Sequence, residues 1–118
     1  MAHATWILAA ALALAVGGPA DAAAAKPVRW IKLADCAAYY RVDARLAPAD
    51  GSAARASQAA DAYGRAAVAR FGAERKATPV VAQHAVDARI KAGLERFAGQ
   101  PPRAAVLTLI GKCPPVGG

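Results

Sequence analysis

The chain has 118 residues, 57% of them hydrophobic and only 6% aromatic, and a formal net charge of +7. This length favours one domain, and its core must be small, because alanine supplies much of the hydrophobic count and buries little area per residue. Alanine is also the strongest helix former, so the composition favours an all-α fold over folds that contain a sheet.

The first 22 residues predict a signal peptide. Residues 6–16 (WILAAALALAV) form an apolar run, and small residues follow that permit cleavage after Ala22 or as late as Ala25. No Lys or Arg precedes the run, and an uncleaved membrane anchor is the alternative. The anchor is disfavoured because the uncharged stretch is short and contains Gly-Gly-Pro, whereas a spanning helix needs about 20 apolar residues. We therefore expect a periplasmic or secreted protein whose mature chain has no transmembrane helix.

Cleavage after Ala22 would remove Asp21 but no Lys or Arg, so the formal charge would rise by one to +8. A positive surplus favours contact with an envelope protein or an anionic envelope polymer, and export argues against a nucleic-acid partner. The alternative is plain solubility, since the basic residues are spread along the chain without a dense block. If the first two helices pack antiparallel, one basic face would hold the candidate anion-contacting residues Arg41, Arg45, Arg55, Arg65 and Arg70.

Residues 26–113 predict a single helical domain, a small antiparallel bundle of three longer helices and one short C-terminal helix. The first helix is expected over about 27–47, because Pro27 is tolerated at an opening helical position. Apolar residues recur there in steps of three and four. The predicted buried stripe consists of Trp30, Leu33, Ala34, Ala37, Tyr40 and Ala44.

The second helix is expected over about 52–71, after a break of turn residues (PADGS). Gly72 fits a left-handed cap at its end, and we expect Gly64 to permit the close approach of a neighbouring helix. Asp61 and Arg65 are spaced as a solvated charge pair on one face, as are most acidic residues of the chain. The predicted buried stripe consists of Ala56, Ala60, Tyr63, Ala67 and Phe71.

The third helix has the clearest boundaries, with Thr78 as N-cap, Pro79 as the first helical residue and Gly99 as the cap after the last turn. Its predicted stripe consists of Ala82, Val86, Ile90, Leu94 and Phe97. The fourth helix, about 102–112, contains a VLTLI run that could also form a buried strand, but no partner strand is evident. Residues 114–118 are expected to form a flexible tail.

The two cysteines, Cys36 and Cys113, most simply form a disulfide in an exported protein. In the chain-entropy model, so long a loop contributes about 4.5 kcal/mol. Tyr39 and Tyr40 point about 100° apart on a helix, so we expect Tyr40 to pack inward beside Cys36 and Tyr39 to be partly exposed. The alternative is a redox-active Cys36, against which stands the absence of a Cys-x-x-Cys motif.

The sequence offers no framework for catalysis, metal binding or a cofactor. His84, the only histidine after the predicted signal peptide, has no Cys or His at helical spacing. Neither a Gly-x-Ser-x-Gly elbow nor a phosphate-binding glycine loop is present. We therefore expect no enzyme, but an exported protein with a non-enzymatic binding or structural role at the cell envelope. The alternative is a small ligand-binding or hydrolase-like bundle with an internal pocket.

Overall fold

The computed structural model describes residues 27–116, which form four helices and contain no strand. The helices are α3 (Trp30–Leu46), α4 (Ser52–Arg75), α5 (Pro79–Arg96) and α6 (Arg103–Ile110). The prediction of an all-α bundle with three longer helices and one short one is confirmed. The VLTLI run lies in α6 and is helical. The predicted signal peptide lies outside the described residues.

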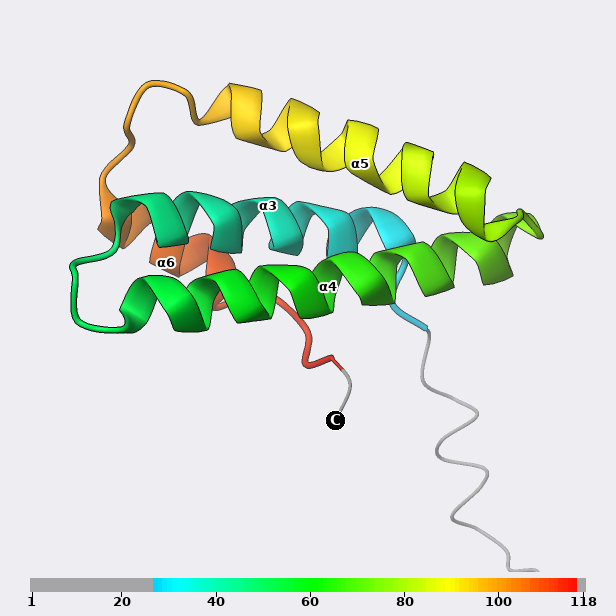
Figure 1. The fold of residues 1–118 in the computed structure, drawn as a ribbon, viewed down its shortest axis with the longest axis horizontal. Helices are drawn as coiled ribbons and strands as arrows, with labels where there is room; N and C mark the ends of the chain where they lie inside the picture. Colours follow the sequence, from blue (N-terminus) through cyan, green and yellow to red (C-terminus); the bar gives the residue numbers. More distant parts are fainter. Residues whose placement is uncertain (1–26, 117–118) are drawn as a thin grey trace, which may run out of the picture.

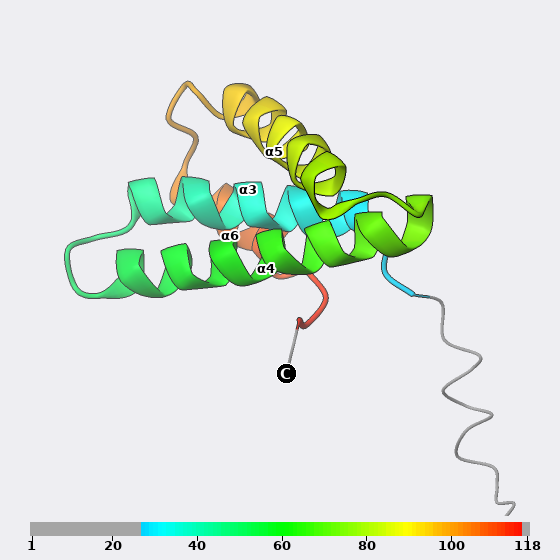
Figure 2. The same ribbon diagram turned by 45° about the vertical axis from the view of Figure 1, so that its right-hand side comes forward.

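The first helix, α3, is the centre of the bundle (Figures 1 and 2). A tight turn sends α4 back antiparallel to α3, and α5 then runs in the direction of α3 across the pair (Figure 1). The short α6 lies antiparallel to α3 on another side, and among the helices it contacts α3 alone. All three other helices therefore pack on α3.

The start of α5 follows the local sequence as expected. The Thr78 hydroxyl accepts a hydrogen bond from the Val81 N–H at 3.3 Å, and Pro79 is the first helical residue. At the other end the prediction of a Gly99 cap is wrong. The helix ends at Arg96 with Phe97 as its C-cap, and the left-handed residue of the following loop is Gln100, with a φ of 63°.

The end of α4 also differs from the prediction. The helix continues one turn past Gly72 to Arg75, because the residues Ala-Glu-Arg that follow are good helix formers. Lys76 takes the left-handed conformation instead, with a φ of 52°, and its N–H donates to the Gly72 carbonyl. The prediction of Gly72 as the cap is therefore wrong, although Gly72 supplies the acceptor that closes the helix.

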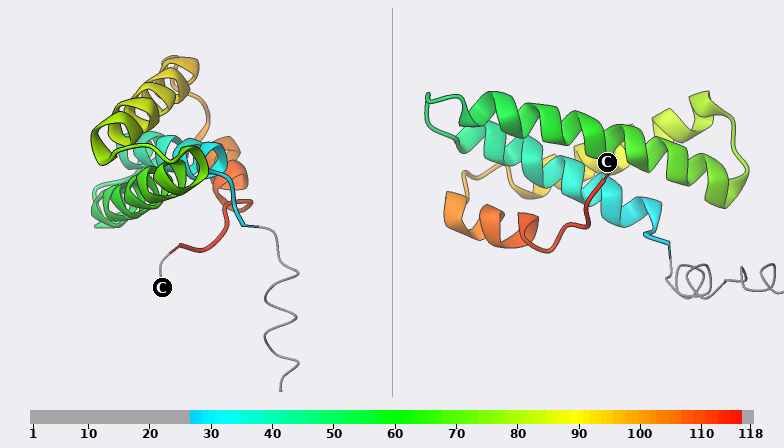
Figure 3. Two further views of the ribbon diagram at one scale, coloured as in Figure 1. Left: turned by 90° about the vertical axis from the view of Figure 1, so that its right-hand side faces the viewer. Right: turned by 90° about the horizontal axis from the view of Figure 1, so that it is seen from below.

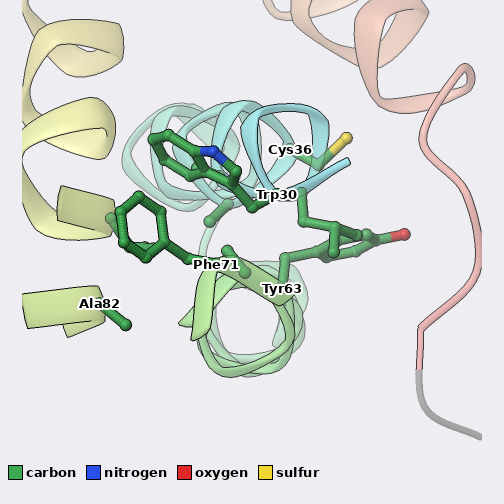
Figure 4. Packing of buried hydrophobic residues seen from close by; sticks show 10 residues of the cluster. Trp30, Cys36, Tyr63, Phe71 and Ala82 are labelled. Atoms are coloured by element: carbon green, nitrogen blue, oxygen red, sulfur yellow. The ribbon is translucent and has the colours of Figure 1, made fainter. Parts of the chain in front are cut away.

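The core lies between α3, α4 and α5, and Figure 4 shows part of it. The Trp30 and Phe71 rings meet edge to face, with centroids 4.9 Å apart. The stripe predicted on α4 is confirmed in full, since all five of its residues are buried. On α5 the prediction holds for Ala82 and Val86, while Ile90, Leu94 and Phe97 are half-buried.

Burial on α3 extends well beyond the single predicted stripe, because three helices pack on different sides of it. Tyr40 and Ala44 of that stripe are only half-buried. The additional buried residues are Cys36, Ala38, Val42 and Asp43. Small side chains at most of these positions allow the neighbouring helices to come close to the α3 backbone.

Gly93 on α5 lies at a close approach to α3. A Cβ atom added at Gly93 would lie 2.8 Å from the Cβ of Ala38 on α3, a distance that real Cβ pairs do not adopt. The expectation that Gly64 permits a close approach is wrong, since a Cβ there would meet no atom within 4 Å. Glycine is thus required at position 93 for packing, whereas at position 64 it only weakens the helix.

Candidate functional site

The predicted disulfide is confirmed. Cys36 is fully buried in α3, and it is bonded to Cys113, three residues after the end of α6, with a Cα–Cα distance of 6.0 Å. No free cysteine is present in residues 27–116. Because α6 has α3 as its sole helical neighbour, the bond fixes α6 and the segment that follows it to the rest of the domain.

The segment after the disulfide crosses α3 towards α4 (Figure 3). The Tyr63 hydroxyl points at this segment from α4 (Figure 4), and it donates a hydrogen bond to the Pro114 carbonyl. Val116 packs against the core. Burial, with a smaller contribution from Tyr40, raises the pKa of Tyr63, so its hydroxyl remains a donor at neutral pH. Within the described residues, 114–116 are therefore held by specific contacts, while 117–118 lie outside that range.

The adjacent tyrosines of α3 face different neighbours. The Tyr40 ring stacks on Tyr63 of α4 with centroids 5.4 Å apart, and the Tyr39 ring meets Phe97 edge to face at 6.0 Å. Both are half-buried, so Tyr39 is partly exposed as predicted, while Tyr40 packs against the core without being fully buried. The pair thus joins α3 to α4 on one side and to the end of α5 on the other.

Ion pairs join different helices instead of residues within one helix. Asp35 of α3 accepts two hydrogen bonds from the Arg89 guanidinium of α5, at 2.8 and 3.0 Å. Asp43, which is only 5% exposed, accepts one from Arg103 of α6 at 2.6 Å. The interpretation of these carboxylates as solvated pairs within one helix is wrong, because the partners lie 54 and 60 residues away.

Glu74 near the end of α4 caps the start of α3. One carboxylate oxygen accepts from Arg29 Nε at 2.8 Å, and the other accepts from the Trp30 backbone N–H at 2.9 Å. Partial desolvation alone would raise the pKa of Glu74, but the hydrogen bonds from Arg29 and Trp30 outweigh it and hold the pKa below its ordinary value of 4.5. The ionised carboxylate therefore stabilises the folded state.

Replacing Glu74 with Gln should make the protein less stable at neutral pH, and the difference should shrink in acid. An acid whose pKa is lower in the folded state contributes its stability above the unfolded-state pKa and loses it as pH falls through the folded-state pKa. The two proteins should thus converge below pH 4.5, the ordinary value for this carboxyl group. Urea unfolding midpoints measured from neutral pH downwards test this, and a gap that stayed constant through the acid range would contradict it.

The candidate anion-contacting arginines are distributed over several sites. Arg41 forms an exposed ion pair with Asp61 at 3.3 Å, which replaces the predicted pairing of Asp61 with Arg65. Arg45 donates to the Phe97 carbonyl at 2.8 Å, and Arg55 donates to the Ser52 hydroxyl at 3.3 Å. The antiparallel packing of α3 and α4 brings Arg41 and Arg65 to the same depression, but Arg55 and Arg70 line two others.

The four ion pairs use most of the acidic side chains. Among the described residues, only Asp50, Asp87 and Glu95 are carboxylates without an ion pair. Many more basic side chains of the described chain lie outside ion pairs, namely Lys32, Arg45, Arg55, Arg65, Arg70, Arg75, Lys76, Lys91, Arg96 and Lys112. The unpaired charge at the surface of the domain is therefore strongly positive.

Three depressions on the surface of the described residues each contain at least one of the candidate arginines. The Arg41 depression, about 200 Å³, lies between α4 and α5 and is lined by Arg41, Asp61, Gly64, Arg65, Gln83, Val86, Asp87 and Ile90. The Arg55 depression, about 380 Å³, is lined by Tyr40, Asp43, Ser52, Arg55, Ala56, Ala59 and Arg103. The Arg70 depression, about 340 Å³, is lined by Val28, Leu33, Ala66, Ala69, Arg70, Pro115 and Val116.

Other chemical features of the described residues are sparse. His84 is exposed on α5. Within 27–116, no group of three His, Cys, Asp or Glu side chains could hold a metal ion. None of the helices in that range is long and apolar enough to cross a membrane. No family model, curated protein or solved structure matches the chain.

Proposed function

We propose that this protein is an exported, non-catalytic binding protein that acts at the cell envelope and contacts an anionic polymer or an acidic protein surface. The observation that carries the proposal is the distribution of charge. Ion pairs take up most carboxylates of the described residues, so the basic side chains that remain have no acidic partner and leave the surface with a positive surplus. Such a surface attracts polyanions over a distance of about one Debye length, roughly 8 Å at physiological ionic strength.

Export is supported by the N-terminal apolar run with small residues after it, and by the disulfide. Disulfides persist in oxidising compartments and are rare in the reducing cytosol. A small domain with few bulky side chains gains most from such a bond, because its core alone supplies little stability. The bond and the predicted signal peptide therefore both favour an oxidising compartment.

The proposal predicts binding to poly-L-glutamate that weakens as salt is added. The oxidised domain should bind this polymer at low ionic strength but should not bind neutral dextran. The double variant Arg55→Gln/Arg65→Gln should bind roughly threefold to tenfold more weakly, because each removes an unpaired charge. Fluorescence anisotropy with labelled polymer over a salt series measures both effects.

A matched control changes the charge in the opposite direction. Asp87→Asn/Glu95→Gln removes two unpaired carboxylates and should tighten binding of the same polymer. Absence of binding, or binding that salt does not weaken, would refute the anionic partner. Recovery of the full-length chain in the cytosol with its first 22 residues intact would refute export.

A further inference from the structure

The Arg70 depression differs from the other two in its lining. The Arg41 depression contains two arginines balanced by Asp61 and Asp87, and in the Arg55 depression Asp43 holds Arg103. The Arg70 depression has one charged residue and is otherwise apolar. Its volume of about 340 Å³ falls within the range of small-molecule sites, roughly 300–1,000 Å³.

Three separate segments form this depression, and specific contacts fix the two that lie outside α4. Val28 precedes α3, whose first turn is capped by Glu74. Ala66 and Ala69 belong to the middle of α4. The remaining wall is the segment with Pro115 and Val116, which the disulfide and the bond from Tyr63 to the Pro114 carbonyl hold across α3 (Figure 3). The depression is therefore preformed, which lowers the cost of binding a ligand.

Arg70 is the only charged side chain that lines the depression. It is half-buried, and no described residue forms an ion pair or a hydrogen bond with it. Glu74, one turn further along α4, attracts Arg70, but its two oxygens already accept from Arg29 and Trp30. A guanidinium that is partly withdrawn from water and unpaired gains most from an anion that enters the same depression.

We propose that the Arg70 depression binds a small amphiphile with one anionic head group and one apolar chain, of the type of a long-chain carboxylate. The head group accepts hydrogen bonds from the Arg70 guanidinium, whose planar donors match a carboxylate. The chain lies against Val28, Leu33 and Val116, which supply the apolar surface. This inference goes beyond the proposed polyanion contact, because it concerns one small ligand and a single depression rather than the charge of the whole surface.

Titration with dodecanoate below its micelle concentration tests the site, with methyl resonances of the oxidised domain as the readout. Resonances of Val28, Leu33 and Val116 should shift and saturate. Those of Val80, Val81 and Leu107 should not move, although these side chains are exposed apolar residues as well. Equal shifts at all exposed methyl groups would show unspecific detergent binding and overturn the proposal.

Substitutions of Arg70 then test the role of its positive charge in binding. Arg70→Gln should weaken dodecanoate binding about tenfold, the effect of losing one charge-assisted hydrogen-bonding partner, whereas Arg70→Lys should recover only part of it, because lysine keeps the charge but not the planar donors. Arg65→Gln is the matched control, since it removes the same charge from α4 at a different depression, and its affinity should equal that of the wild type. Equal affinities of Arg70→Gln and wild type would overturn the proposal.

The result is separable from that of the polyanion experiment. Binding of poly-L-glutamate without any saturable shift from dodecanoate would refute the amphiphile site alone. Saturable dodecanoate binding without polyanion affinity would refute the envelope contact alone. Association only with vesicles that contain anionic lipid, and not with the free carboxylate, would identify a membrane surface as the ligand and overturn the small-ligand proposal.

Discussion

Replacing Cys36 with Ala and Cys113 with Ser should lower the free energy of unfolding by about 4.5 kcal/mol, the value that the chain-entropy model gives for so long a loop. The two cysteines are 77 positions apart, so the bond restricts most of the described chain in the unfolded state. Small domains have a total stability of only about 5–15 kcal/mol. The variant should therefore be near the limit of folding at physiological temperature.

Urea unfolding followed by far-UV circular dichroism measures this loss. Reductant supplies the control, because it should destabilise the wild type to a similar degree and leave the double variant unchanged. If the variant and the oxidised wild type unfold at the same urea concentration, the bond contributes little and the small core is sufficient. That outcome would contradict the stability argument for the disulfide.

Gly93→Ala should destabilise the protein by about 1–3 kcal/mol, the usual cost of forcing an extra carbon into a packed interface. The new Cβ would lie 2.8 Å from the Cβ of Ala38 across the α3–α5 contact. Alanine is otherwise the better helix former by about 1 kcal/mol. A loss of stability would thus show that close packing outweighs helix propensity at this position.

Three further variants isolate the clash. Gly64→Ala makes the same change in α4 where a Cβ meets no atom within 4 Å, so it should stabilise the protein by about 0.5–1 kcal/mol. In the background of Ala38→Gly, the Gly93→Ala change should become much less harmful, because the opposing carbon is gone. Thermal unfolding of the wild type, Gly93→Ala, Ala38→Gly and the double variant gives the coupling energy between positions 38 and 93. A coupling energy near zero would contradict the contact.

The sequence predicts the helices and the buried face of α4 well, for a physical reason. α4 buries one side, so its apolar residues repeat with the helical period and the five members of its stripe stand out. The start of α5 could also be predicted, because Thr78 caps the helix and Pro79 is its first residue, and both effects act within the first turn. The cysteine pair could be predicted because the chain contains only two.

The role of α3 could not be predicted in the same way. Helices pack on three of its sides, so its buried residues do not form a single stripe, and alanine at a buried position cannot be distinguished from alanine at an exposed one. The partners of Asp35 and Asp43 lie more than fifty residues along the chain, beyond the reach of any helical spacing.

The candidate site was predictable only in part. Net charge indicates an anionic partner, but the candidate arginines do not form one face: Arg41 and Arg65 share a depression, whereas Arg55 and Arg70 line two others. The apolar lining beside Arg70 comes from three segments, including Val28 and Val116 at opposite ends of the described chain. No periodicity connects such residues, because their proximity depends on the disulfide and on the path of the C-terminal segment.

Because α6 packs on α3 alone among the helices, one flank of α3 stays uncovered until the end of the domain has been synthesised. Of the helices in residues 27–116, α3 is the first to be synthesised and α6 is the last. Until α6 arrives, the flank of α3 that carries Cys36 and Asp43 has no native cover, although α4 and α5 can already assemble against its other flanks. Cys36 cannot form its native bond until Cys113 has been synthesised, so during that interval its thiol can react with another thiol or disulfide instead.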